Sequence, residues 1–154
     1  MKRNRIISLA AASVLALTML AGCGNKNALK DGKYKAEYDK EDTRGWKAFT
    51  EIEVKDGKIV SANYDYVNKD GKLKSKDAEY NKAMKDKSGT SPAEYSPALG
   101  KALVDKQDPS KVDKVTGATH SSDAFKEMAK KLMDEKAKKG DQTTLKLPQT
   151  DVKK

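Results

Sequence analysis

The spacing of apolar residues changes once along the chain, from every second residue to every third or fourth, and this change restricts the fold most. Residues 32–38 alternate between apolar and polar side chains, and residues 46–54 do so over a longer run, as half-buried strands require. Asp56-Gly57 suits the positive backbone angles of a tight hairpin, so residues 58–67 are expected to form the returning strand. The buried face of the second strand is predicted to carry Trp46, Ala48, Thr50, Ile52 and Val54.

Helical spacing begins after Gly71. Residues 78–85 predict a modest helix with Ala83 and Met84 as candidate buried positions. Ser91-Pro92 opens a second helix, because serine can cap a helix and proline is tolerated in its first turn. Its buried face is predicted to carry Tyr95, Leu99, Ala102 and Leu103.

The last helix is expected to begin near Ser121 or Ser122 and to end before Gly140. Five apolar residues follow the helical repeat on one of its faces: Phe125, Met128, Ala129, Leu132 and Met133. From Asp141 onward the sequence is polar, and a loose tail is expected over 141–154.

Strands therefore come first and helices afterwards. This order favours an α+β fold, in which a small antiparallel sheet from the N-terminal half is covered by helices from the C-terminal half. Residues 30–140 form one domain in this interpretation, which is long enough to bury a single core.

The N-terminus has the layout of an export signal. Basic residues precede an apolar run too short to be a comfortable transmembrane helix, and Leu20-Ala21-Gly22-Cys23 resembles a bacterial lipobox. Residues 1–22 are therefore predicted to be a lipoprotein signal peptide, Cys23 the site of lipid attachment, and residues 23–29 a tether. Two alternatives stay open: an ordinary secretory signal, and release of a short apolar peptide from residues 14–22 as a pheromone.

The charge and the cysteine and histidine content exclude several classes of function. The net charge is +9, but lysines are interleaved with acids and no arginine-rich block occurs, so no nucleic-acid partner is expected. A single cysteine excludes an internal disulfide and multi-cysteine zinc or iron–sulfur sites. His120 is the only histidine, which makes a metal site unexpected. Any redox chemistry would need an organic cofactor.

One stretch carries a motif with a chemical meaning. Asp113, Thr116, Gly117, Ala118 and Thr119 occupy the defined positions of Asp-x-x-Ser/Thr-Gly-Ala-Thr, so the sequence resembles the FMN-binding domain family. That resemblance implies FMN joined to Thr119 through a phosphodiester, added by a Mg-dependent flavin transferase that uses FAD. His120, Ser121 and Ser122 are further candidate neighbours of the cofactor. Asn81 and Met84, which lie in a family-like stretch, are added as weaker candidates.

The wider sequence is similar to flavoprotein lipoproteins of Gram-positive extracellular electron transfer. This similarity implies an electron-transfer protein rather than a substrate-turnover enzyme, anchored by lipid to the outer face of the cytoplasmic membrane. Its partners would be a membrane electron donor, membrane lipid, and an extracellular acceptor or second flavoprotein. The FMN itself supplies the redox chemistry in such a protein.

Other interpretations of these residues remain. The motif could be a glycine turn that leads into a capped helix, and the protein a cofactor-free binding or adhesive surface lipoprotein. Several aromatic residues could either border a flavin ring or fill the core; these are Trp46, Tyr64, Tyr66, Tyr80 and Tyr95.

Overall fold

The computed structural model describes residues 28–149, so the signal segment and Cys23 lie outside the described part. Three strands form an antiparallel meander: β1 (Gly32–Tyr38), β2 (Lys47–Lys55) and β3 (Lys58–Val67). Asp56 and Gly57 have φ values of 50° and 72°, which confirms the tight hairpin between β2 and β3. The α+β class is therefore confirmed.

A fourth strand corrects the expectation of a loose tail. Residues of β4 (Leu145–Leu147) pair in parallel with β1, which gives a mixed sheet of order β3-β2-β1-β4. Leu147 is buried, and its carbonyl accepts a hydrogen bond from the Asp39 amide at 2.8 Å. Three residues are too few to show an alternating pattern, and the strand they pair with lies far earlier in the chain.

Three α-helices follow the meander: α1 (Ala78–Ser88), α2 (Pro92–Lys106) and α3 (Thr119–Leu132). Shorter turns accompany them, namely η1 (Lys74–Lys76), η2 (Pro109–Lys111) and a π-helical turn, η3 (Met133–Ala137).

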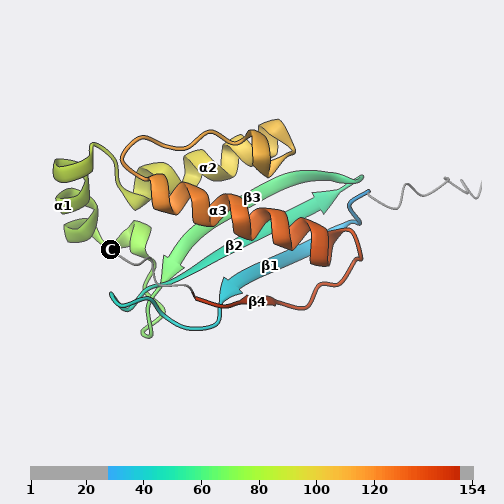
Figure 1. The fold of residues 1–154 in the computed structure, drawn as a ribbon, viewed down its shortest axis with the longest axis horizontal. Coiled ribbons are helices and arrows are strands. Elements are labelled where there is room, and N and C mark those ends of the chain that lie inside the picture. Colours follow the sequence, from blue (N-terminus) through green and yellow to red (C-terminus); the bar gives the residue numbers. More distant parts are fainter. Residues whose placement is uncertain (1–27, 150–154) are drawn as a thin grey trace, which may run out of the picture.

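Two helix predictions need correction. α3 begins at Thr119, two or three residues before the expected start, because the chain turns at Gly117 and becomes helical directly after Ala118. α1 buries none of its residues fully, and Ala83 is exposed while Met84 is half-buried. α1 lies at one end of the domain rather than over the sheet, so it has little apolar surface to cover (Figure 1).

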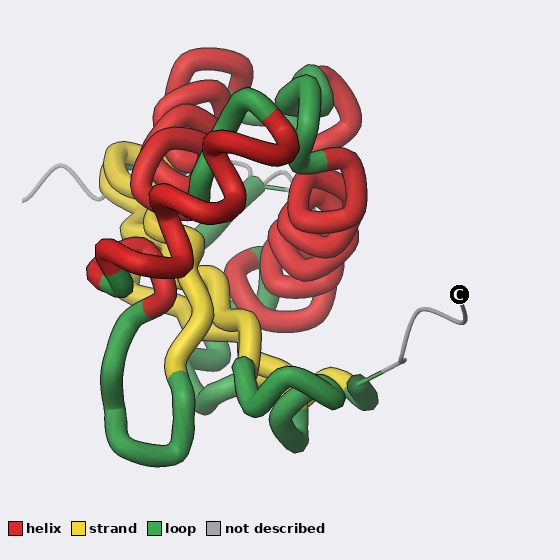
Figure 2. Tube along the Cα trace, turned by 90° about the vertical axis from the view of Figure 1, so that its left-hand side faces the viewer, coloured by secondary structure: helices red, strands yellow, loops and turns green. Residues whose placement is uncertain are grey.

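α2 and α3 lie side by side on one face of the sheet, α2 over β3 and α3 over β1 and β2 (Figures 1 and 2). Gly100 permits the close approach of α2. A Cβ atom at this position would lie 2.3 Å from the Ala62 carbonyl oxygen of β3, so any larger side chain would push the helix away from the sheet.

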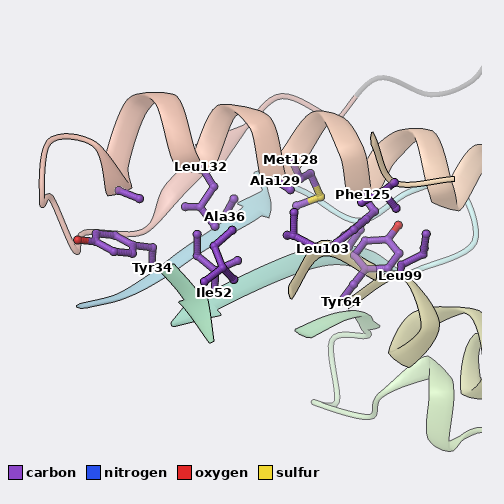
Figure 3. Close-up of a cluster of buried hydrophobic side chains, with 14 of the residues drawn as sticks. Tyr34, Ala36, Ile52, Tyr64, Leu99, Leu103, Phe125, Met128, Ala129 and Leu132 are labelled. Carbon is purple, nitrogen blue, oxygen red and sulfur yellow. The ribbon is translucent and has the colours of Figure 1, made fainter. Parts of the chain in front are cut away.

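The core lies between this sheet face and the two helices (Figure 3). The predicted buried face of β2 is confirmed at all five positions. On α3, Phe125, Met128 and Leu132 are each 0% exposed, whereas Met133 is only partly buried at the start of η3. α3 is therefore fixed against the sheet, and this packing positions residues 112–118, which lead into the helix.

Candidate functional site

The turn before α3 is held against the end of α1. Gly117 has φ 81°, a region that side chains disfavour, and a Cβ atom there would lie 2.0 Å from the carbonyl oxygen of Ser88 and 3.2 Å from Cγ2 of Thr90. Only glycine fits this position without displacing the backbone of α1. The glycine of the motif is thus required by the local packing.

Ser122 stabilises the same turn through two hydrogen bonds. Its side chain is fully buried, and its hydroxyl donates to the Ala118 carbonyl at 2.9 Å and accepts from the Val115 amide at 3.0 Å. Ser122 therefore shapes the turn from within the protein. Ser121 is half-buried and reaches a different neighbour, Tyr66.

Thr119 is the first residue of α3 and is exposed, as is His120. Ala118 occupies the N-cap position without a side-chain cap, and the first turn holds no acidic residue. The first backbone N–H groups of α3 therefore have no capping side chain and lie at the positive end of the helix dipole. An anion attached to the Thr119 hydroxyl would be stabilised here.

Asp113 and Thr116 lie on the surface beside this turn. The Asp113 side chain is 92% exposed, and its carboxylate lies 2.6 Å from the Lys106 ammonium, which lowers the pKa of Asp113. Thr116 is exposed as well. Asp113, Thr116 and Thr119 are thus all accessible from solvent.

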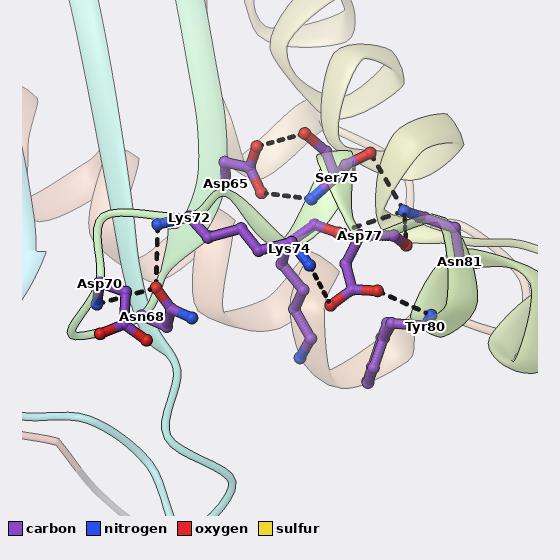
Figure 4. Close-up of polar contacts among 9 residues, drawn as sticks. All are labelled: Asp65, Asn68, Asp70, Lys72, Lys74, Ser75, Asp77, Tyr80 and Asn81. Carbon is purple, nitrogen blue, oxygen red and sulfur yellow. Dashed lines mark hydrogen bonds and ion pairs between the residues drawn. The ribbon is translucent and has the colours of Figure 1, made fainter.

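Asn81 is used for internal structure. Its amide nitrogen donates to the carbonyls of Lys74, Ser75 and Asp77, at 3.2, 3.0 and 2.6 Å (Figure 4). Its oxygen accepts from the Ala93 amide at 2.9 Å. Asn81 thereby connects η1, α1 and the start of α2. Its polar atoms are all satisfied within the protein.

The candidate aromatics separate into two groups. Tyr64 and Tyr95 are core residues, each at most 2% exposed, and burial raises the pKa of both. The Tyr64 hydroxyl donates to Tyr66 at 2.7 Å, and the Tyr66 hydroxyl donates to Ser121 at 2.9 Å. A chain of hydroxyl groups thus runs from the core to the first turn of α3.

The second group surrounds a residue that the sequence did not single out. The Lys74 ammonium lies 4.5 Å from the ring centroids of Tyr66 and Tyr80, and 5.5 Å from that of Trp46. One lysine among many in a lysine-rich chain gives no signal of this kind in the sequence. We call Lys74 and its three rings the lysine cage.

Within residues 28–149, no helix has both the length and the apolar character needed to cross a membrane.

The fold and the turn at Thr119 define a small α+β domain with an exposed hydroxyl at an uncapped, electropositive helix start. The sequence profile of the FMN-binding domain matches residues 45–134, a range that contains the whole turn. The chain belongs to the FMN-binding domain family.

Two relatives are similar over most of their length. A 15 kDa lipoprotein of Treponema pallidum (strain Nichols) is 37% identical over 131 residues, which cover 85% of this chain and 92% of the relative. The crystal structure of a protein from Clostridium perfringens has 41% sequence identity and a TM-score of 0.75, and the match covers 79% of this chain and 99% of that one. The relationship thus extends over most of the chain.

Proposed function

We propose that this protein is a lipid-anchored, extracytoplasmic flavoprotein that carries FMN on Thr119 through a phosphodiester and relays electrons with it. The observation that carries the proposal is the position of Thr119. It is the first residue of α3, exposed, and the last residue of the flavinylation motif within the matched family region.

The residues at this turn fit such a group. Gly117 and Ala118 place no bulky side chain beside the Thr119 hydroxyl, and Ala118 is itself buried. The uncapped amides at the start of α3 would bind the remaining phosphate charge. FMN supplies the chemistry, because it accepts and releases electrons, whereas the protein supplies attachment, orientation and electrostatics.

The exposure of the motif side chains supports a role for a modifying enzyme. Thr116 and the Asp113 carboxylate lie in the open, where a flavin transferase that uses FAD and Mg²⁺ could bind them. Covalent attachment also suits a protein outside the cell, since a tethered cofactor keeps a high local concentration that diffusion would otherwise reduce. A membrane electron donor and an extracellular acceptor, or a second flavoprotein, would complete the relay.

The intact mass of the mature protein tests this proposal. After incubation with an active flavin transferase, FAD and Mg²⁺, we expect a gain of one FMN less one water, and a yellow protein that keeps its flavin through denaturation. The same protein incubated without the transferase is the control and should gain nothing. If the protein stays colourless beside a transferase that modifies another substrate, the cofactor-free binding lipoprotein takes the place of this proposal.

Lipid attachment at Cys23 gives a separate prediction. A Cys23→Ser variant lacks the thiol that would receive the lipid, so we expect uncleaved precursor or soluble export in place of membrane-bound protein. Palmitate labelling in the native host measures this directly. Equal label in the wild type and the variant would show that Cys23 is not the lipid site.

A further inference from the structure

Lys74 is a buried cation without an anionic partner. It is 5% exposed, and lysine is rarely buried this deeply unless its charge is paired. Within residues 28–149, no carboxylate lies within ion-pairing distance of its ammonium. The three rings of the lysine cage take the place of such a partner.

Two carboxylates that lie beside η1 make their contacts with residues other than the Lys74 ammonium. Asp65 accepts from the Ser75 amide at 3.1 Å and from the Ser75 hydroxyl at 2.5 Å. Asp77 pairs with the Lys72 ammonium at 3.1 Å and caps α1 (Figure 4). An aromatic face attracts a cation without cancelling its charge, so the positive charge of Lys74 remains effective in its surroundings.

The lysine cage is joined to the first turn of α3. The Tyr66 ring contacts the Lys74 ammonium, and the Tyr66 hydroxyl donates to Ser121, two residues after Thr119. Asn81 holds the Lys74 carbonyl, so the backbone of the lysine is fixed as well. The positive N-terminus of α3 therefore lies on one side of Tyr66, and the unpaired Lys74 ammonium lies on the other. Both would stabilise a negative charge placed nearby.

We propose that Lys74 provides a fixed positive charge beside the FMN site and raises the reduction potential of the flavin. This inference rests on the proposed function. When two electrons from the membrane donor and one proton from solvent enter the ring system of FMN, that ring system goes from neutral to singly negative. A nearby cation stabilises the negative form relative to the neutral one, most strongly where water is excluded.

Three variants test this role in the flavinylated protein. Lys74→Met keeps a long side chain and removes the charge, whereas Lys74→Arg keeps the charge. Lys76→Met is the matched control, because Lys76 lies in the same η1 turn but is exposed, where solvent and salt screen its charge. The readout is the ratio of reduced to oxidised flavin in equilibrium with a redox dye held at a fixed potential.

We expect the ratio to fall at least tenfold in Lys74→Met, which corresponds to about 30 mV for a two-electron couple. Lys74→Arg and Lys76→Met should stay within about threefold of the wild type, since the buried charge is kept in both. An unchanged ratio in Lys74→Met overturns the proposal, and so does an equal fall in Lys76→Met, because the effect would then be one of net charge alone.

A fourth variant separates an effect of the Lys74 charge from an effect of unfolding. Tyr80→Leu removes one half-buried ring of the lysine cage and keeps the lysine, so a smaller fall in the same direction is expected. Fluorescence emission from Trp46, the only tryptophan in the sequence, reports whether the lysine cage is intact in each variant. Denaturation-resistant flavin is measured separately in every variant. A wild type without flavin overturns both proposals, whereas an unchanged potential in flavinylated Lys74→Met and Tyr80→Leu overturns only the role of Lys74.

Discussion

Replacing Thr119 with alanine is expected to abolish covalent flavin completely while the fold remains. The substitution removes the one oxygen to which the FMN phosphate would be joined, so the mass gain, the yellow colour and the denaturation-resistant flavin should all disappear. Thr119 is exposed and is not the N-cap of α3, so the free energy of unfolding should change by about 0.5 kcal/mol or less. Intact mass and a denaturant titration measure the two effects.

Two further substitutions make this experiment specific. Thr116→Ala changes an exposed threonine in the same turn and keeps the acceptor, so any flavin that the transferase adds to this variant should still be attached at Thr119. Thr119→Ser restores an oxygen at the same position and should recover part of the modification. If the Thr119→Ala protein still carries flavin after denaturation, the attachment site lies elsewhere in the chain.

The largest loss of stability is expected for Leu132→Ala. Leu132 is 0% exposed on the face of α3 that packs against the sheet (Figure 3). Truncation removes its buried methyl groups and leaves a cavity, which should lower the free energy of unfolding by about 2 to 5 kcal/mol. Urea denaturation of the unflavinylated protein measures this difference without a contribution from the cofactor.

Val60→Ala is the control for this loss. Val60 is 46% exposed on β3, so the same kind of truncation should cost about 0.5 kcal/mol or less. A loss of similar size in the Leu132→Ala protein would mean that Leu132 does not lie in the core, and the packing of α3 would need to be revised.

Much of the fold follows from local sequence patterns. The alternation over residues 46–54 predicted the buried face of β2, and the helical repeat from Phe125 to Leu132 predicted the buried face of α3. Asp56-Gly57 predicted the hairpin that joins β2 to β3. These features depend on residues close in the chain, whose side chains have to match the period of a strand or a helix.

The weaker predictions failed where the local pattern was short. The helix at residues 78–88 was expected to bury Ala83, but a short amphipathic pattern does not show whether a neighbouring surface exists to cover it. The early start of α3 depends on the turn at Gly117, whose shape is fixed by contact with Ser88 rather than by the helical sequence itself.

The sequence by itself determined the three strands of the meander, the three α-helices, the class of fold and the motif that ends at Thr119. Only the tertiary structure decided that β4 pairs with β1 and that Lys74 lies among Trp46, Tyr66 and Tyr80. A periodic pattern reports which side of one element is buried, whereas contacts between distant segments depend on how all the elements pack together. The lysine cage has no periodic signal, because its four residues come from the loop just before β2, the end of β3, η1 and α1.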